Sequence, residues 1–324
     1  MEKLIEVKNA KKYFPLKKKY PWSKQDYLKA VDDVSFDIYK GETLGIVGES
    51  GSGKSTLGKC ITNIHPVTDG EIYYNNKLTT GKKHKELAWF RENIQAIFQD
   101  PYSSLNPKLN VFDLVAEPLR IGNKYSEEEI AKRVYDMLDK VGITRESIEK
   151  KPSEFSGGQR QRISIARAIS TNPEFILCDE PISALDVSIQ AQIVNLLEDL
   201  QKELGLTYLF IAHDLSMVRH ISHRTMVMYL GNIVEIGNSN DIYENPLHPY
   251  TKGLLNSVLD PVPRKDKDKP LNTISNDIPS PIDLPKGCVF YKRCSKCMEK
   301  CKNEKPKLID VGNGHKVACF LLDK

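Results

Sequence analysis

The chain has 324 residues, 40% of them hydrophobic and 28% charged, and its formal net charge is +4. These values are ordinary for a soluble globular protein of roughly two domains. The small net charge argues against a dedicated nucleic-acid binder, in which basic residues cluster on one face. We interpret the basic runs at residues 15–20 and 264–269 as solvated loops.

The N-terminal stretch lacks the apolar core of a secretory signal, and no run of about 18 consecutive apolar residues occurs. We therefore expect a cytosolic chain that does not itself span a membrane. Five of the seven cysteines lie between residues 288 and 319. Because disulfides are rare in the cytosol, this crowding favours a metal site over a disulfide framework.

The first chemical motif is GESGSGKST at residues 48–56, between an expected buried strand, TLGIV, and a helix-compatible run. It fits the phosphate-binding pattern G-x-x-x-x-G-K-[ST], whose backbone N–H groups form an anion nest at a helix N-terminus. Lys54 supplies charge to the β- and γ-phosphates, the Ser55 hydroxyl can bind Mg²⁺, and Thr56 can reach the α-phosphate. The predicted loop comprises Gly48, Glu49, Ser50, Gly51, Ser52, Gly53, Lys54, Ser55 and Thr56.

Further apolar strands are expected at IQAIFQD, EFILCDEP and LTYLFIAHD, and each ends in polar residues. Their alternation with helical patterns indicates an α/β sheet, which binds ligands at the carboxyl ends of its strands. In EFILCDEP, Asp179 is placed to hold Mg²⁺, and Glu180 is placed where a general base can orient an attacking water.

Between residues 102 and 155 the strand signals stop. The run at 126–142, SEEEIAKRVYDMLDKVG, has helical spacing behind an acidic first turn, so it predicts an inserted helical region. FSGGQRQR at 155–162 then opens another helix-compatible run. Ser156 and the following glycines suggest a second anion site at a helix N-terminus, and an ordinary N-cap is the alternative.

Towards the C-terminus, RTMVMYLGNIVEIG predicts paired strands around Leu230, Gly231 and Asn232. From about residue 258 the chain is rich in Pro, Asp and Lys and lacks periodicity, which indicates a linker or irregular arm.

Six motifs in one order resemble those of the nucleotide-binding subunits of ATP-binding-cassette (ABC) transporters: GESGSGKST, IFQDP, FSGGQRQR, FILCDEP, SALD and IAHD. The resemblance implies an α/β P-loop NTPase cassette with a RecA-like core, an antiparallel β subdomain and an inserted α-helical subdomain at about 102–160. The expected nucleotide-binding domain spans residues 1–257, and a small Cys-rich C-terminal domain spans 258–324.

The resemblance also implies a head-to-tail dimer, in which the signature of one cassette completes the ATP site of the other. Phe14 is expected to stack on adenine, with Tyr13 as the fallback and burial of Phe14 in the core as the alternative. The signature acting in trans would be Ser156, Gly157, Gly158 and Gln159. The expected catalytic residues are Lys54, Gln99, Glu180 and His213, and the expected Mg²⁺ ligands are Ser55, Gln99 and Asp179.

Longer stretches, including IFQDPYSSLNP, NPLHPYTKGLL and GCVFYKRC, resemble the peptide-importer branch, closest to the F-type ATPase subunits of oligopeptide permeases. This implies an ATPase subunit bound peripherally at the cytoplasmic face of the membrane. The implied partners are a non-identical D-type ATPase, two permease subunits and an extracellular peptide-binding protein. A nickel or glutathione importer is the alternative substrate class, and a soluble ABC ATPase acting on DNA or ribosomes is the alternative from another class.

The cysteine spacing in the tail is C-x₅-C-x₂-C-x₃-C-x₁₇-C, and such short spacings suit zinc or an iron–sulfur cluster. The resemblance implies a [4Fe–4S] cluster, with zinc or a metal-free tail as alternatives. The implied ligands are Cys288, Cys294, Cys301 and Cys319. Cys297 is either a spare thiol or part of a zinc pair with Cys294, whereas Cys60 and Cys178 are expected to be inert, buried thiols.

Overall fold

The computed structural model of the protein describes residues 2–18, 20, 22–257, 279–282 and 284–323. The chain divides into two compact units, which are described in turn. The first contains Met1–Ile5, Asp37–Thr43 and Tyr73–Ala212, and the second contains Glu6–Phe36, Leu44–Ile72 and His213–Lys324. The predicted linker around 258–278 and the basic run at 264–269 lie outside the described residues.

The centre of the first unit is a set of parallel strands, β6 (Ile94–Ile97), β7 (Phe175–Asp179) and β8 (Thr207–Ile211). Ile97 is in register with Cys178, and Cys178 with Phe210, so the three carboxyl ends meet at one edge. Every residue of β7 and β8 is buried, as expected for apolar strands covered on both faces. All three strands were predicted from the sequence and are confirmed.

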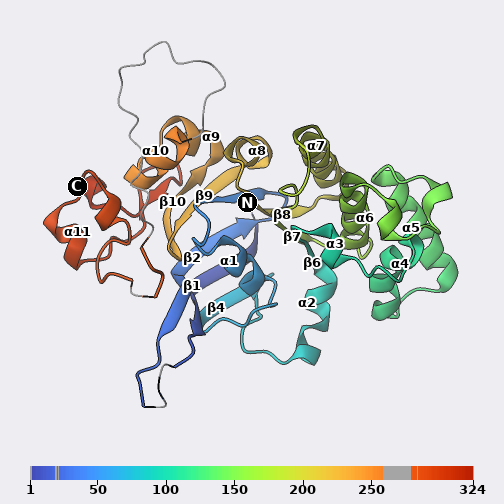
Figure 1. Ribbon diagram of the computed structural model, residues 1–324, viewed down its shortest axis with the longest axis horizontal. Helices are drawn as coiled ribbons and strands as arrows, with labels where there is room; N and C mark the ends of the chain where they lie inside the picture. The colour runs from blue at the N-terminus through green and yellow to red at the C-terminus, as the bar shows by residue number, and fades with distance from the viewer. Residues whose placement is uncertain (1, 19, 21, 258–278, 283, 324) are drawn as a thin grey trace, which may run out of the picture. The chain divides into compact units, whose positions relative to one another are not determined.

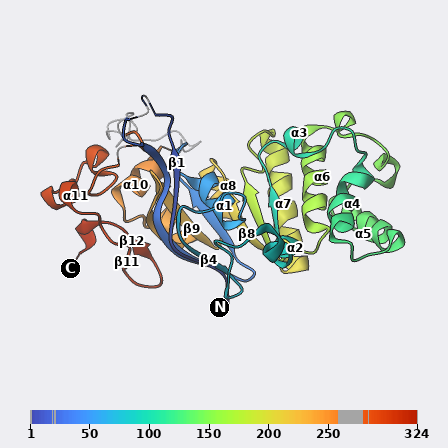
Figure 2. The ribbon, with the colours of Figure 1, turned by 90° about the horizontal axis from the view of Figure 1, so that it is seen from below.

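In the segment from residue 102 to residue 155 of the first unit, all the regular elements are helices. The predicted helical insertion is therefore confirmed. Ser126 caps α5 (Glu127–Lys140) through a capping box with Glu129, and Ile130, Val134 and Leu138 form its buried stripe. Helices α4 (Val111–Gly122), α5 and α6 (Gly157–Ile169) lie side by side in Figures 1 and 2. The remaining elements of this unit are β5 (Lys77–Leu78), η1 (His84–Leu87), α2 (Ala88–Asn93), α3 (Pro101–Ser104), η2 (Arg145–Ser147), η3 (Pro152–Glu154) and α7 (Val187–Leu204).

The second unit holds most of an antiparallel sheet in the order β2-β1-β4, built from β1 (Lys3–Pro15), β2 (Tyr27–Tyr39) and β4 (Asp69–Tyr74). Its other sheet starts with β3 (Thr43–Val47), which pairs in parallel with β9 (Arg224–Tyr229). β9 then forms a hairpin with β10 (Asn232–Asn238), as the sequence predicted. The connecting residues Leu230 and Gly231 have φ of 43° and 75°, the left-handed conformation that a two-residue hairpin turn requires.

Before the C-terminal tail, the second unit contains the helices α1 (Lys54–Ile61), α8 (Leu215–Ile221), α9 (Ser239–Glu244) and α10 (Pro249–Asn256). Among the described residues, no helix is both long enough and apolar enough to cross a membrane.

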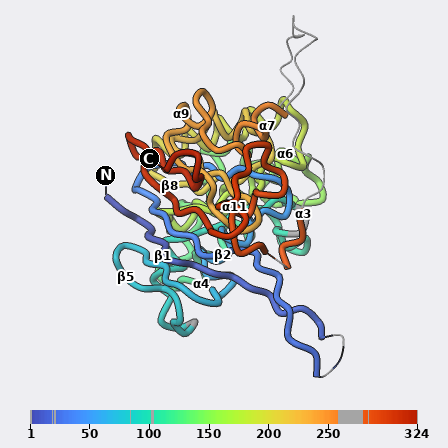
Figure 3. The backbone as a smooth tube through the Cα atoms, turned by 90° about the vertical axis from the view of Figure 1, so that its left-hand side faces the viewer, coloured from blue at the N-terminus to red at the C-terminus, as the bar shows by residue number. Residues whose placement is uncertain are grey.

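The C-terminal tail, defined here as residues 288–323, is part of the second unit, and Figure 3 shows it in red with α11. Its β12 (Lys316–Val317) adds to the sheet by pairing with β10 and with β11 (Ile309–Asp310). Buried Glu235 of β10 accepts hydrogen bonds from the backbone of Leu247 (2.8 Å) and His248 (3.0 Å) and lies 2.8 Å from the His315 ring. The remaining tail elements are η4 (Tyr291–Arg293), α11 (Glu299–Asn303) and η5 (Phe320–Leu322).

Because the tail extends the sheet of the second unit, a separate Cys-rich C-terminal domain is not confirmed. The predicted boundary between residues 257 and 258 stays a prediction.

Candidate functional site

The loop at residues 48–56 connects β3 to α1 in the second unit, as the phosphate-binding pattern predicted. Gly48, Gly51 and Gly53 all have positive φ. A Cβ on Gly48 would lie 2.2 Å from the Met228 carbonyl oxygen, and one on Gly53 would lie 2.1 Å from that of Ala30. These glycines are therefore needed both for the turn and for close packing of the loop against neighbouring backbone.

The Lys54 side chain of this loop is turned towards the loop's own backbone. Lys54 is buried, and its Nζ donates to the carbonyl oxygens of Gly48 (2.8 Å) and Glu49 (3.0 Å). Ser55 and Thr56 stand half-buried in the first turn of α1. Within the described part of the chain, the buried Ser52 hydroxyl has no hydrogen-bond partner. A glycine-rich loop that leads into a helix N-terminus and carries an ammonium and an unpartnered hydroxyl has the chemistry to bind a polyphosphate.

The two candidate adenine platforms, Tyr13 and Phe14, lie at the end of β1 in the second unit. The Tyr13 hydroxyl hydrogen-bonds Asp32, and Lys29 Nζ lies 5.6 Å from its ring centroid. Burial and the adjacent Asp32 carboxylate raise the pKa of Tyr13 well above its usual range. Phe14 is half-buried, with its ring edge-on to His65 at 5.8 Å. Lys12 Nζ lies 4.9 Å from the Phe14 ring centroid, so both rings have partners, and Phe14 as the adenine platform stays a prediction.

In the first unit, three predicted residues gather at the carboxyl edge of the parallel strands. Asp179 is the last residue of β7 and is 5% exposed, and Glu180 follows it. Gln99 comes two residues after β6, at the same edge. The Glu180 backbone has φ 54°, and its N–H donates to the Ile211 carbonyl oxygen at 2.9 Å. A non-glycine residue held in this disfavoured conformation is typical of functional sites.

The predicted signature forms the N-terminus of α6, also in the first unit. Ser156 is the N-cap: its Oγ accepts from Gln159 N (3.3 Å), and Gln159 Oε1 accepts from Ser156 N (3.0 Å). A Cβ on Gly158 would lie 2.6 Å from Ile189 Cγ2, so glycine lets α7 approach. Ser156 and Gln159 are exposed and accessible to another molecule. The N-cap interpretation and the anion-site interpretation are therefore compatible.

His213 lies two residues after β8 and begins the last segment of the second unit. It is exposed, and the next residue, Asp214, caps α8 by accepting from Ser216 N (2.8 Å) and Met217 N (3.1 Å).

The tail cysteines separate into two groups. Four of the five line one cavity together with His248, Phe290 and Lys296; these are Cys288, Cys294, Cys301 and Cys319. Each of the four sulfurs also accepts a backbone hydrogen bond, from Phe290, Lys296, Met298 and Leu321 respectively. Burial raises the pKa of the Cys288 thiol to about 11.

Cys297 differs from these four. It does not line the cavity, and its Sγ donates to the Met298 carbonyl oxygen at 3.5 Å. Among the described residues, no three His, Cys, Asp or Glu side chains are close enough together to hold a metal ion. Four thiols around one cavity, each with an amide donor, nevertheless form a donor set with the chemistry of Cys₄ ligation. Cys60 and Cys178 are buried, as predicted.

Sequence patterns missed three residues that hold the phosphate loop and the β1–β2 strands. Arg293 of the tail forms an ion pair with Glu49, the Tyr250 hydroxyl accepts from Glu49 N, and Lys305 contacts Asp32. Their partners are far away in the sequence, so no local pattern pointed to them.

Comparison with known proteins adds the following. Residues 31–183 match the family described as "ABC transporter", and residues 234–301 match "Oligopeptide/dipeptide transporter, C-terminal region". The chain is 49% identical to the oligopeptide transport ATP-binding protein OppF of Haemophilus influenzae, over 98% of this chain and 97% of that protein. It is 47% identical to OppF of Escherichia coli, over 99% and 96%. Among solved structures, the ATP-binding cassette MJ0796, in a dimeric post-hydrolysis state bound to ADP and Pi, matches with a TM-score of 0.64 and 31% identity. That match covers 73% of this chain and 99% of MJ0796.

Proposed function

The chain belongs to the ABC transporter family, among the ATP-binding subunits of oligopeptide permeases, and on this basis we propose that it hydrolyses ATP to energise oligopeptide import. It has the ABC ATPase cassette fold, and family membership implies ATP and Mg²⁺. The finer assignments that follow are part of the proposal.

Each group of the candidate site takes one role in this proposal. The loop at 48–56 binds the phosphates, with Lys54 contributing its charge, and Phe14 supports the base. Ser55, Gln99 and Asp179 would hold Mg²⁺, which when bound neutralises charge on the β- and γ-phosphate oxygens. Glu180 orients the attacking water and accepts its proton, and His213 contacts the γ-phosphate. The signature at Ser156–Gln159 serves the ATP site of a second cassette.

The observation that carries the hydrolytic assignment is the backbone of Glu180. Its backbone is held at φ 54° directly after the buried Asp179, at the edge where Gln99 also lies. Hydrolysis of ATP depends mainly on positioning and electrostatics, so a rigidly held base meets its main requirement.

The proposed assembly is a head-to-tail pair of this F-type chain with a D-type ATPase, bound to two permease subunits at the cytoplasmic face of the membrane. An extracellular peptide-binding protein delivers the substrate. The C-terminal region shared with oligopeptide and dipeptide transporters favours this assembly over a soluble ATPase acting on DNA or ribosomes. A nickel or glutathione importer would use the same ATP-hydrolysing residues of this chain together with a different extracellular binding protein.

Copurification of the tagged chain with permease subunits, followed by transport assays in vesicles, tests the proposal. We expect ATP-dependent uptake of oligopeptides when the binding protein is present. ATPase activity stimulated by DNA or ribosomes, without copurifying permeases, would contradict the transport function.

We further propose that the four cavity-lining cysteines bind a [4Fe–4S] cluster. These four thiols line one cavity and each accepts a backbone hydrogen bond, and a set of four cysteines is the usual ligand set of such a cluster; a zinc ion is the alternative. In this assignment Cys297 is not a ligand. Anaerobic purification with metal analysis tests it, and zinc without iron would overturn the cluster assignment.

A further inference from the structure

The C-terminal tail makes a double ion pair with the phosphate-binding loop. Arg293 Nη1 and Nη2 donate to Glu49 Oε2 (2.8 Å) and Oε1 (2.9 Å). The Arg293 side chain is 4% exposed and that of Glu49 is 21% exposed. A bidentate pair that is largely shielded from water is geometrically specific, and only arginine can form it.

The groups that surround this pair are also contacted by the tail. Arg293 Nη1 donates to the Tyr229 hydroxyl at 3.1 Å, and Glu49 N donates to the Tyr250 hydroxyl at 2.9 Å. Phe290 of the tail packs against both tyrosine rings, with centroid distances of 5.3 and 5.4 Å. Both the side chain and the backbone of Glu49 are therefore held by groups that the tail contacts.

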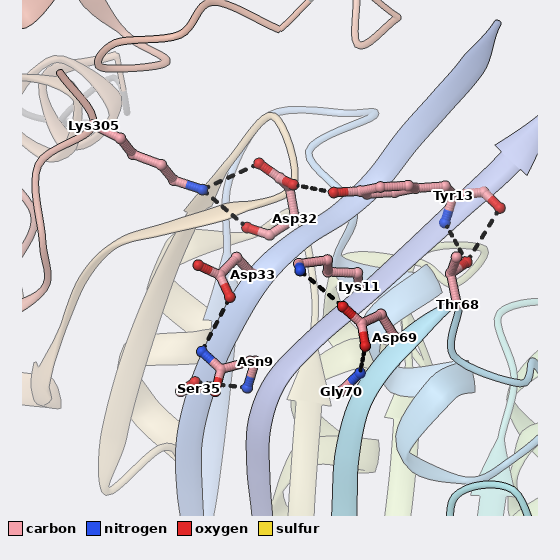
Figure 4. A network of polar contacts seen from close by, with 10 residues as sticks. All are labelled: Asn9, Lys11, Tyr13, Asp32, Asp33, Ser35, Thr68, Asp69, Gly70 and Lys305. Carbon is pink, nitrogen blue, oxygen red and sulfur yellow. Dashed lines mark hydrogen bonds and ion pairs between the residues drawn. The ribbon is translucent and has the colours of Figure 1, made fainter.

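A second contact joins the tail to the region of the base platform, as Figure 4 shows. Lys305 Nζ lies 3.1 Å from Asp32 Oδ2, and the other oxygen of Asp32 accepts from the Tyr13 hydroxyl. Tyr13 directly precedes Phe14, the preferred adenine platform. Asp32 is also linked to the phosphate loop through backbone bonds, because its N–H donates to Gly231 O (2.8 Å) and Gly231 N donates to Ser52 O (2.9 Å).

We propose that the C-terminal tail is a positioning element of the ATP site, in which Arg293 holds the phosphate loop through Glu49 and Lys305 holds the base platform through Asp32 and Tyr13. The proposal rests on the proposed ATP-binding function and extends it to residues that need not touch the nucleotide. Arg293 directly precedes Cys294, which lines the cysteine cavity. A change in the conformation of the cavity would therefore also move Arg293.

The effect should fall on nucleotide affinity more than on turnover. A loop that is not held in advance must be ordered when ATP binds, and this lowers the apparent affinity. Once ATP is bound, its own phosphate contacts keep the loop in place. Loss of the tail contact therefore raises KM and leaves kcat nearly unchanged.

The first experiment compares Arg293→Gln with wild type, using a fluorescent ATP analogue for binding to the full-length chain and steady-state ATPase of the assembled transporter. We expect Kd and KM to rise roughly tenfold and kcat to stay within about twofold. Arg293→Lys keeps the positive charge but cannot make the two parallel hydrogen bonds to the carboxylate, so it should give an intermediate KM. Arg219→Gln removes an exposed ion pair with Glu244 in the same unit and serves as the matched control, expected to behave like wild type.

A double-mutant cycle with Glu49→Gln isolates the contact. We expect the double variant to have about the same KM as either single variant, since the pair acts as one unit. If the KM increases of the two single variants multiplied in the double variant, the two side chains would act independently and the role of Arg293 would be overturned. A wild-type Kd for Arg293→Gln would overturn it as well.

If Arg293→Gln proves to unfold the tail, as judged by limited proteolysis, Lys305→Gln tests the proposal through the other contact and should raise Kd with the tail still protected. A wild-type Kd for Lys305→Gln would then overturn it. Failure of the wild-type chain to bind the analogue would instead refute the proposed ATP-binding function, so the two failures are distinguishable.

Discussion

Glu180 adopts a left-handed backbone conformation that side chains other than glycine, asparagine and aspartate rarely occupy. The hydrogen bond from its N–H to Ile211 O and the adjacent buried strand hold it there. Such strain costs on the order of 1–3 kcal/mol and persists where the surrounding structure over-determines the conformation. The strained residue stands at the carboxyl edge of the sheet, directly after the buried Asp179.

Replacing Glu180 by Gln should leave ATP binding intact and reduce turnover about a hundredfold or more, because the amide cannot accept the proton of the attacking water. Nucleotide binding and single-turnover ATPase measure the two effects separately. Glu174→Gln makes the same chemical change just before the other end of β7 and keeps an acceptor for the Tyr74 hydroxyl, so near-normal turnover is expected there. Near-normal turnover of the Glu180 variant would show that the assigned base is wrong.

His248 is a second residue whose environment has a measurable consequence. It is 1% exposed, its Nδ1 accepts from Tyr250 N at 3.0 Å, and burial lowers its pKa to about 3. The charged groups nearest to it are Glu235, which accepts from its backbone N–H, and Lys296, which lines the same cavity.

Because the folded pKa of His248 is below its unfolded value near 6.5, the unfolded chain takes up a proton first as the pH falls. His248 should therefore contribute a loss of unfolding free energy of about 1.4 kcal/mol per pH unit from about pH 6.5 downwards. Urea unfolding at pH 7.0 and 5.5 measures this loss. His248→Asn keeps a capping acceptor without titrating, so its pH slope should be shallower, and an unchanged slope would count against the assignment.

At the scale of elements, helix α6 shows how a functional motif is also a packing motif. Its Ser156 cap, its glycines and its close neighbour α7 all meet at one end. Gly158, a residue of the proposed anion site, lacks the Cβ that would collide with Ile189.

Gly158→Ala should lower the unfolding free energy by about 1–3 kcal/mol, because the new Cβ lies 2.6 Å from Ile189 Cγ2 and the two helices must separate. Gly122→Ala at the end of α4 is the matched control. No atom lies within 4 Å of its added Cβ, so stability should stay within about 0.5 kcal/mol of wild type or rise. Chemical denaturation of both variants checks the difference, and equal stabilities would contradict the close packing of α6 on α7.

At the scale of the whole molecule, the tail is tied to the cassette by the β10–β12 pairing, by Glu235 and by the Arg293 and Lys305 contacts. All of these connect residues widely separated in the sequence. The cysteine cavity is therefore built into the unit that carries the phosphate loop.

Alkylation of the native chain should distinguish the seven cysteines. If the proposed cluster is bound, only Cys297 should react with iodoacetamide. After chelation the half-buried Cys294 and Cys319 should react as well, and the buried Cys288 and Cys301 should react more slowly than these two. Cys60, 3% exposed with a pKa raised by burial to about 11, and Cys178, 0% exposed, should stay unmodified until the chain unfolds. Peptide mass spectrometry measures each site. Protection of Cys297 together with the other four would make it a ligand.

If the proposed cluster is present, its removal should also weaken ATP binding, since Arg293 and Cys294 are adjacent. We expect chelation to raise the Kd of the wild-type chain for an ATP analogue severalfold and to change that of Arg293→Gln much less. Equal sensitivity of both proteins would show that the metal acts on the nucleotide site by another route.

The sequence alone was sufficient for the family, the strands β3, β6, β7 and β8, the helical insertion and the β9–β10 hairpin. These depend on local spacing: a buried parallel strand is a short apolar run, and a phosphate loop needs its glycines and lysine at set intervals. The proposed site residues came from the same motifs, and the structure agrees locally at the glycines of the loop and at the backbone of Glu180.

Only the tertiary structure decided which cysteines share a cavity, that Tyr13 is engaged by Asp32, and that the tail belongs to the unit of the phosphate loop. Glu49 and Arg293 are 244 residues apart, and nothing in either local sequence specifies the other. Ion pairs and hydrogen bonds of this kind form only after sheet pairing has brought distant segments together. The spacing of residues in local motifs therefore determined which side chains are candidates for ATP binding and hydrolysis. Long-range packing decided which distant residues hold those side chains in position.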